Sequence, residues 1–257
     1  MSLKFNNGEV EDITYNGTPI NEVRFNGTTV WKRQTDPATV AEFTQPGTYT
    51  LTVPQDGGYR IIAIGPGGGC ALASLSSTSG VLVQYSAVVS SGGSGGYVET
   101  IYSLFKGETL TITVGSLGKN KTFIGNNVNE EIYSSSGSES SVKVLNRVGQ
   151  NLTIARAFGG EGGIIVTRVV QNSRGGVGGS GEAPNGTIQE GNNGVVDYSN
   201  TNGNILATAT ASFTSTPYAS TSIAGRGSGG EAYSSKTQRD FSEINLGTDG
   251  YVKIIKL

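Results

Sequence analysis

Gly159-Gly160-Glu161-Gly162-Gly163 places two pairs of glycines around one residue with a side chain, and Gly175-Gly176-Val177-Gly178-Gly179 repeats this pattern. Related clusters start at Gly65, Gly92 and Gly225. A three-residue period matches the left-handed polyproline-II helix, which has three residues per turn and no internal hydrogen bonds. Because buried amides need partners, the clusters predict packed polyglycine-II-type helices joined by hydrogen bonds between segments. Flexible Gly/Ser linkers are the alternative interpretation.

The sequence between the clusters predicts β-strands. Thr48–Val53 and Thr109–Val114 alternate apolar and polar residues, as strands with one buried face do, and Tyr59–Ile64 is more continuously apolar. Further strands are predicted at 96–101, 141–145, 152–157, 164–170, 205–213 and 251–255. With 40 Gly among 257 residues and only 15% charged residues, the chain lacks the composition of a helical bundle. We therefore expect an all-β fold in which a β-sandwich-like glycine-rich domain contains the polyglycine-II-type segments.

The first 33 residues repeat with a period of ten and predict a small β-meander. Asn-Gly pairs at 7–8, 16–17 and 26–27 favour tight hairpin turns. Such a meander is too small to be stable alone in water, so it needs a partner surface. We expect a repeat module at 1–34 and a glycine-rich domain at 35–257. The module is either an extension of the main core or an attachment module, whose contact residues would be Phe5, Tyr15, Phe25 and Trp31.

Several segments resemble the glycine-rich domains of bacteriophage tail fibres and adhesins. The closest likeness lies in Pro46–Pro54, Ile61–Gly69 and Lys106–Gly115, and the final Asp249–Val252 is similar to the last strand of that family. The repeats around Tyr15 and Phe25 likewise look like segments of phage tail proteins. The resemblance implies a virion protein, made in the host cytoplasm, whose repeat module contacts other tail proteins and whose variable loops touch the host surface.

Bulk properties exclude several classes of partner and chemistry. The net charge of −2 offers no basic surface for nucleic acid, and the start of the chain has no apolar signal-peptide core. With no His and one Cys, we expect neither a transition-metal site nor a cofactor. Gly92-Gly93-Ser94-Gly95-Gly96 fits the G-x-S-x-G nucleophile motif, but the usual histidine base is missing. We therefore expect no enzyme. The alternative is a sugar hydrolase, because the separation in space of its Asp and Glu pairs is not visible in the sequence.

Binding residues are expected in the polar segments between the glycine clusters, at 71–91, 119–136 and 182–222. Rigid aromatic side chains among Ser, Thr, Asn and Gly suit recognition of a host-surface glycan or an outer-membrane protein. The candidates are Tyr198, Tyr218, Phe213, Tyr85 and Tyr133, of which Tyr198 and Tyr218 lie in the most turn-rich sequence. The alternative for each is packing beneath its own loop.

Three functions follow as hypotheses. The first is a tail-fibre or tail-tip protein that recognises and adheres to the host cell. The second is a virion component without a receptor, such as a capsid decoration or baseplate part, and the third is a polysaccharide depolymerase. A homo-trimer and a monomer are both compatible with the sequence.

Overall fold

A computed structural model describes residues 4–5, 8–9, 14–15, 18–19, 22–26, 28–32, 38–79, 82–126, 130–167, 172–199, 205–207, 227, 229, 232–234 and 247–257. These residues form strands and extended segments, and no α-helix occurs among them, which confirms the predicted all-β class. Contacts divide the chain into two compact units. The first comprises Met1–Ala38 together with Leu257, and the second comprises Thr39–Lys256.

The first unit consists of hairpins that follow the decapeptide repeat. β1 (Lys4–Phe5) pairs with β2 (Gly8–Glu9), β3 (Thr14–Tyr15) with β4 (Thr18–Pro19), and β5 (Glu22–Phe25) with β6 (Thr28–Lys32). The described strands pair only within each hairpin, not across the repeats as in a continuous meander. Asn26 has the positive φ (48°) that a tight hairpin turn requires. In the first repeat Gly8 lies in β2, opposite Phe5, so it is not part of the hairpin turn that the Asn7-Gly8 pair predicts.

The second unit begins with two five-stranded sheets. One has the order β20-β12-β9-β24-β7 and the other the order β19-β17-β16-β13-β8. Their strands are β7 (Ala38–Phe43), β8 (Gly47–Thr52), β9 (Gly57–Ile64), β12 (Tyr97–Leu104), β13 (Thr109–Val114), β16 (Ser140–Leu145), β17 (Asn151–Ala157), β19 (Gly181–Glu182), β20 (Thr187–Gln189) and β24 (Tyr251–Lys256). In β13 every second residue is buried, as the alternation of its sequence predicts.

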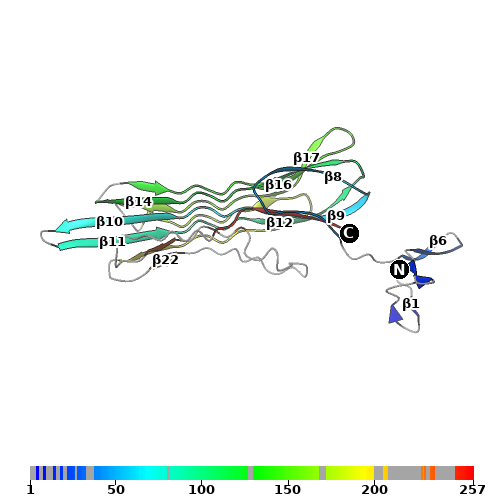
Figure 1. Cartoon of the computed structure of the whole chain (residues 1–257), viewed down its shortest axis with the longest axis horizontal. Helices are drawn as coiled ribbons and strands as arrows, with labels where there is room; N and C mark the ends of the chain where they lie inside the picture. Colours follow the sequence, from blue (N-terminus) through cyan, green and yellow to red (C-terminus); the bar gives the residue numbers. More distant parts are fainter. Residues whose placement is uncertain are drawn as a thin grey trace. The chain divides into compact units, whose positions relative to one another are not determined.

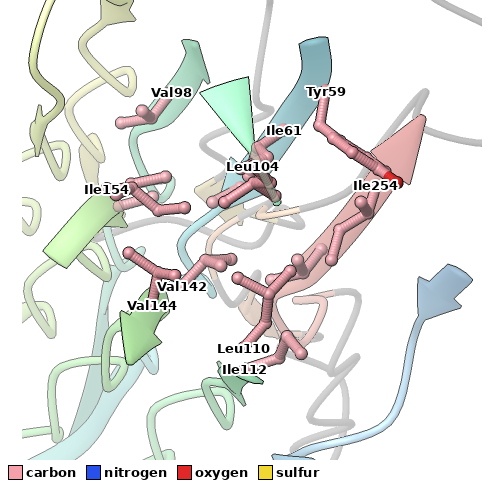
Figure 2. Close-up of a cluster of buried hydrophobic side chains, with 14 of the residues drawn as sticks. Tyr59, Ile61, Val98, Leu104, Leu110, Ile112, Val142, Val144, Ile154 and Ile254 are labelled. Atoms are coloured by element: carbon pink, nitrogen blue, oxygen red, sulfur yellow. The ribbon is translucent and has the colours of Figure 1, made fainter. Parts of the chain in front are cut away.

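The two sheets enclose the main hydrophobic core. Figure 2 shows Tyr59, Ile61, Val98, Leu104 and Ile254 from one sheet beside Leu110, Ile112, Val142, Val144 and Ile154 from the other, all of them buried. Side chains from the two inner faces thus interdigitate as in a β-sandwich, which confirms that part of the fold prediction. We call this part of the unit the sandwich.

Beyond the sandwich lie extended segments outside any strand, which Figure 1 shows as wavy traces running side by side between the sandwich and the labelled strands β10, β11 and β14. We call them the glycine bundle: residues 65–69, 91–96, 115–120, 134–139, 158–163, 175–180, 191–195 and 247–250. Hydrogen bonds join neighbouring segments with a period of three. Phe158 and Glu161 donate to the carbonyls of Ser180 and Val177, whereas Gly160 and Gly163 donate to those of Pro66 and Gly69, over 2.8–3.0 Å. Bonds between segments, and not within them, characterise packed polyglycine-II-type helices.

Glycine is required in the bundle by space. Gly68, Gly160 and Gly176 each face a backbone carbonyl of a neighbouring segment, and a Cβ added to any of them would lie well inside 3.0 Å of its oxygen. Among the described cluster glycines only Gly227 has a positive φ (72°), so the left-handed backbone region does not explain the others. Phe158 and Glu161 occupy the third, outward line of their segment, where side chains have room.

Polar side chains satisfy further amides of the bundle. The Ser94 hydroxyl accepts from the Asn192 amide (2.6 Å), and the Ser91 hydroxyl accepts from the Val195 amide (2.9 Å), which lies three residues, or one helical turn, away along both segments. The side-chain oxygens of Asn193 and Asp249 accept from the amides of Gly178 and Leu117 in the same way. These oxygens replace the carbonyl that a further segment would supply.

A smaller group of strands lies at the other end of the bundle, which we call the distal end. Its four-stranded sheet has the order β14-β10-β11-β21, with β10 (Ala71–Ser79), β11 (Leu82–Ser90), β14 (Lys121–Asn126) and β21 (Val196–Ser199). β15 (Glu131–Tyr133) pairs with β18 (Ile164–Val166), and β22 (Ile205–Ala207) with β23 (Ala232–Ser234). A second cluster of buried residues, distinct from the sandwich core, comprises Ala71, Ala73, Val88, Ile132 and Ile165.

The distal strands correct three loop predictions. Segment 71–91 is mostly the β10–β11 hairpin, and segment 119–136 contains β14 and β15. Segment 182–222 contains β20 and β21 in addition to β22, which lies within the predicted strand 205–213. The physical reason is nonlocal pairing. β10 pairs in parallel with β14, so that Ala71 lies opposite Lys121, a partner that local apolar alternation does not reveal.

Replacing Gly160 by Ala tests the spatial requirement. We expect Gly160→Ala to lower the free energy of unfolding by about 3 kcal/mol, and the melting temperature by about 10 °C, because the Gly93 carbonyl must move to admit the new methyl group. Thermal unfolding followed by circular dichroism measures the change.

Glu161→Ala is the matched control for this experiment. It puts the same methyl group on the outward line of the same helical turn, where Glu161 is exposed, and its melting temperature should stay within about 2 °C of wild type. Equal destabilisation by the two substitutions would contradict close packing at Gly160.

A candidate binding face at the distal end

Strands leave the bundle at the distal end and return to it there. β10, β14, β18 and β21 each begin where a segment of the bundle ends, and they run away from the bundle. β11 and β15 each end where another segment of the bundle begins. The distal end thus brings together strands that are far apart in the sequence.

Tyr133, Ile164 and Arg174 form one row across the distal end, which we call the Tyr133 row. Ile164 and Arg174 exchange both backbone hydrogen bonds at 2.9 Å, which makes them directly opposed residues of an antiparallel pair. Tyr133 is opposite Ile164 on its other side. The Ser90 hydroxyl also donates to the Arg174 carbonyl (2.7 Å), so the backbone beneath this row is held from two strands.

The alternation of β15 and β18 gives the row an exposed side. Ile132 and Ile165 are buried in the distal core, so their neighbours Tyr133 and Ile164 project to the opposite face. Tyr133 is 56% exposed and Ile164 is partly exposed. The face therefore combines an exposed aromatic ring with a half-exposed aliphatic side chain.

Hydrogen bonding positions Tyr133 within this face. Its hydroxyl donates to the Glu131 carboxylate two residues earlier in β15. This bond, with smaller contributions from desolvation and the Glu131 charge, raises the pKa of Tyr133 above its ordinary value, and the nearby Arg174 opposes the shift. The bond thus favours the protonated form of the phenol and restrains the orientation of its ring.

Arg174 differs from the other arginines whose side chains are described. Arg60 pairs with Glu99, Arg147 with Asp56, and Arg156 with Glu139 and Glu182. No described carboxylate lies within ion-pair distance of the exposed Arg174 guanidinium. Its donors are consequently available to a ligand.

The predicted binding residues have different positions in this frame. Tyr133 lies in the Tyr133 row. Tyr85 is on β11 and lies opposite Ser76 of β10, and Tyr198 is on β21 and lies opposite Val88 of β11. The side chains of Tyr85 and Tyr198, and the whole of Phe213 and Tyr218, lie outside the described residues. The same holds for the side chains of the predicted attachment residues Phe5, Tyr15, Phe25 and Trp31, which lie on β1, β3, β5 and β6.

Sequence reasoning missed Arg174. It directly precedes the cluster at Gly175. Its one recognisable signal is that it lies three residues before Val177, the spacing of residues whose side chains point outward from a bundle segment. Its opposition to Ile164 depends on pairing between the 158–163 and 175–180 segments, which the local sequence does not encode.

In the described part of the chain, the G-x-S-x-G motif lacks the geometry of a catalytic site, and no group of acidic or Cys side chains has that of a metal site. Ser94 of the G-x-S-x-G match is buried, and its hydroxyl is bonded to the Asn192 backbone. Among the described residues, no three His, Cys, Asp or Glu side chains come together as metal ligands would. A search of the same residues for a helix long and apolar enough to cross a bilayer finds none.

Comparison with known proteins bears on the second unit. A family model described as a glycine-rich domain matches residues 44–253, which include the glycine bundle, the distal strands and the sandwich apart from β7 and the end of β24. No match to the chain was found among curated proteins.

The Tyr133–Glu131 bond predicts an alkaline titration. Ionised Tyr133 cannot donate this bond and repels the carboxylate, so the stabilisation is present below the unfolded-state pKa of about 10 and is lost as pH rises through the higher folded-state pKa. Tyrosinate absorbance is measured as a function of pH for wild type and for Tyr133→Phe. The difference between the two curves gives the titration of Tyr133 alone. It should occur above pH 10 and move down in Glu131→Gln, whereas a midpoint unchanged by that substitution would contradict the bond.

Proposed function

We propose that this chain, which belongs to the glycine-rich domain family, is a bacteriophage tail protein, of a tail fibre or tail tip, that recognises and adheres to the host cell surface. The second unit is the adhesive part in this proposal. The sequence resemblance to phage tail fibres and adhesins supplies the viral setting.

One observation carries the proposal: a hydrogen-bonded backbone bundle separates the hydrophobic sandwich from a distal group of strands that leave the bundle and return to it. Recognition surfaces are commonly built from connections held by a rigid scaffold, because sequence changes in them leave the scaffold intact. The bundle restrains each distal strand at its base through bonds between segments. The distal end therefore suits a variable binding surface.

The first unit is proposed to attach the protein to other virion tail proteins. Its repeated two-stranded hairpins have the form of units that are only marginally stable in isolation and gain stability from a partner surface.

Shortening the β10–β11 hairpin tests the proposal. The pairs from Ser77–Gln84 to Ser79–Leu82 extend past the last β14 pair, Ser76–Asn126, and past β21. Replacing residues 77–84 by Asn-Gly should leave the melting temperature within a few degrees of wild type, because the strands that pair with β14 and β21 remain. Binding of labelled protein to bacteria, chosen from a strain panel for wild-type binding, should fall about tenfold or more.

A change at the sandwich end provides the control. Val148 is 78% exposed in the β16–β17 turn, and Val148→Ser should not alter binding. Unchanged binding by the shortened hairpin would count against the distal end, and wild-type protein that enters virions but binds no strain would favour a component without a receptor. Release of reducing sugars from host polysaccharide would instead establish a depolymerase. Deleting all of 182–222 is unsuitable because it removes β20, β21 and a bundle segment.

A further inference from the structure

We propose that the Tyr133 row is a seat for one uncharged pyranose residue of a surface glycan. The ring of Tyr133 would stack on the sugar, Ile164 would form the floor, and Arg174 would donate hydrogen bonds to its hydroxyls. This inference rests on the proposed function for the source of the glycan, whereas the sugar class follows from the row itself.

The spacing of the row fits a single sugar ring. Tyr133 and Ile164 form a non-hydrogen-bonded pair, since both backbone groups of Ile164 are bonded to Arg174, and such pairs have Cα atoms about 4.5 Å apart. The hydrogen-bonded Ile164–Arg174 pair adds about 5.5 Å. The Cα atoms of Tyr133 and Arg174 are thus separated by about 10 Å, with the shorter Ile164 side chain between them.

The side chains of the row match the two surfaces of a pyranose. A sugar ring has a face of C–H groups, which packs on an aromatic ring, and a rim of hydroxyls, which both donate and accept hydrogen bonds. Tyr133 offers the ring with little rotational freedom, since its hydroxyl is bonded to Glu131. Arg174 offers several donors in a fixed plane and has no described acidic partner.

The surrounding charge favours a neutral sugar over an acidic one. Glu131 lies in the same strand as Tyr133, and Glu161 lies one helical turn before Ile164; both are exposed. Among the described side chains of this face, two carboxylates against one guanidinium disfavour a uronic or sialic acid, whose own carboxylate adds like charge. The free acceptor positions of the two carboxylates suit hydroxyl hydrogens instead.

An array of immobilised oligosaccharides tests the seat with the full-length chain. The array carries neutral glucosyl, galactosyl and mannosyl oligosaccharides beside uronic-acid and sialylated ones. We expect binding to a neutral subset, confirmed for the selected oligosaccharide by saturation-transfer NMR. Tyr133→Ala and Arg174→Gln should each weaken that binding about tenfold or more, and Tyr133→Phe should weaken it less because the stacking ring remains.

Phe105→Ala is the matched control, since Phe105 is an aromatic side chain of comparable exposure (46%) at the sandwich end. Its glycan binding should equal wild type, and the melting temperatures of all variants show that each is folded. Preference for acidic glycans, equal loss in Phe105→Ala, or no loss in Tyr133→Ala and Arg174→Gln would overturn the seat.

Cell binding separates this inference from the proposed function. Wild type that adheres to bacteria but binds no oligosaccharide on the array overturns the sugar seat and leaves adhesion standing. Wild type that binds a neutral oligosaccharide through Tyr133 and Arg174 but adheres to no bacterial strain supports the seat and removes the proposed adhesive role.

Discussion

The second unit depends on one constraint: backbone carbonyls of the glycine bundle occupy the space where neighbouring residues would carry Cβ atoms. Gly68, Gly160 and Gly176 face such carbonyls, so the segments are joined by backbone hydrogen bonds in place of apolar side chains. Ordering glycine costs about 0.5–1 kcal/mol per residue relative to alanine, and a net hydrogen bond contributes about 0.5–1.5 kcal/mol. The distance between neighbouring segments and their backbone hydrogen bonds therefore depend on each other. A methyl group that pushes two segments apart also breaks the hydrogen bonds that offset the entropic cost of ordering the glycines.

The same constraint explains why Ser, Asn and Asp accompany the glycines. Where a segment has no further neighbour, or a neighbour in the wrong register, its amides still need acceptors. Ser94, Asn193 and Asp249 supply side-chain oxygens to those amides. A polar composition of this kind would suggest a disordered chain, but here the polar side chains belong to the hydrogen-bonded glycine bundle.

Sequence periodicity predicted the parts of the fold that are locally encoded. The three-residue spacing around Glu161 indicated packed extended helices, and the alternation of Thr109–Val114 gave β13 with its correct bounds. The β10–β11 hairpin was taken for a loop because its Ser-rich strands depend on β14, about 50 residues away, for pairing. The candidate site was predictable only where it is encoded locally. Tyr133 was recognisable as an aromatic in a polar segment, whereas Arg174 reaches the row only through its pairing with Ile164.

Ile164 lies where the three-residue period of the bundle meets the two-residue period of a β-strand. The combination leaves an outer surface whose side chains can vary without disturbing the fold. Ile164 continues the outward line of Phe158 and Glu161, which has a period of three, and it begins β18, where Ile165 turns inward with a period of two. Positions on the inner side are fixed by the distal core, and the glycines on the other two lines are fixed by neighbouring carbonyls. Tyr133 and Arg174 are subject to neither restriction, because their side chains project from the outer face. Substitutions in the Tyr133 row thus change the chemistry offered to a ligand while the buried contacts beneath it stay the same, which is the property that a proposed adhesive surface needs when its target changes.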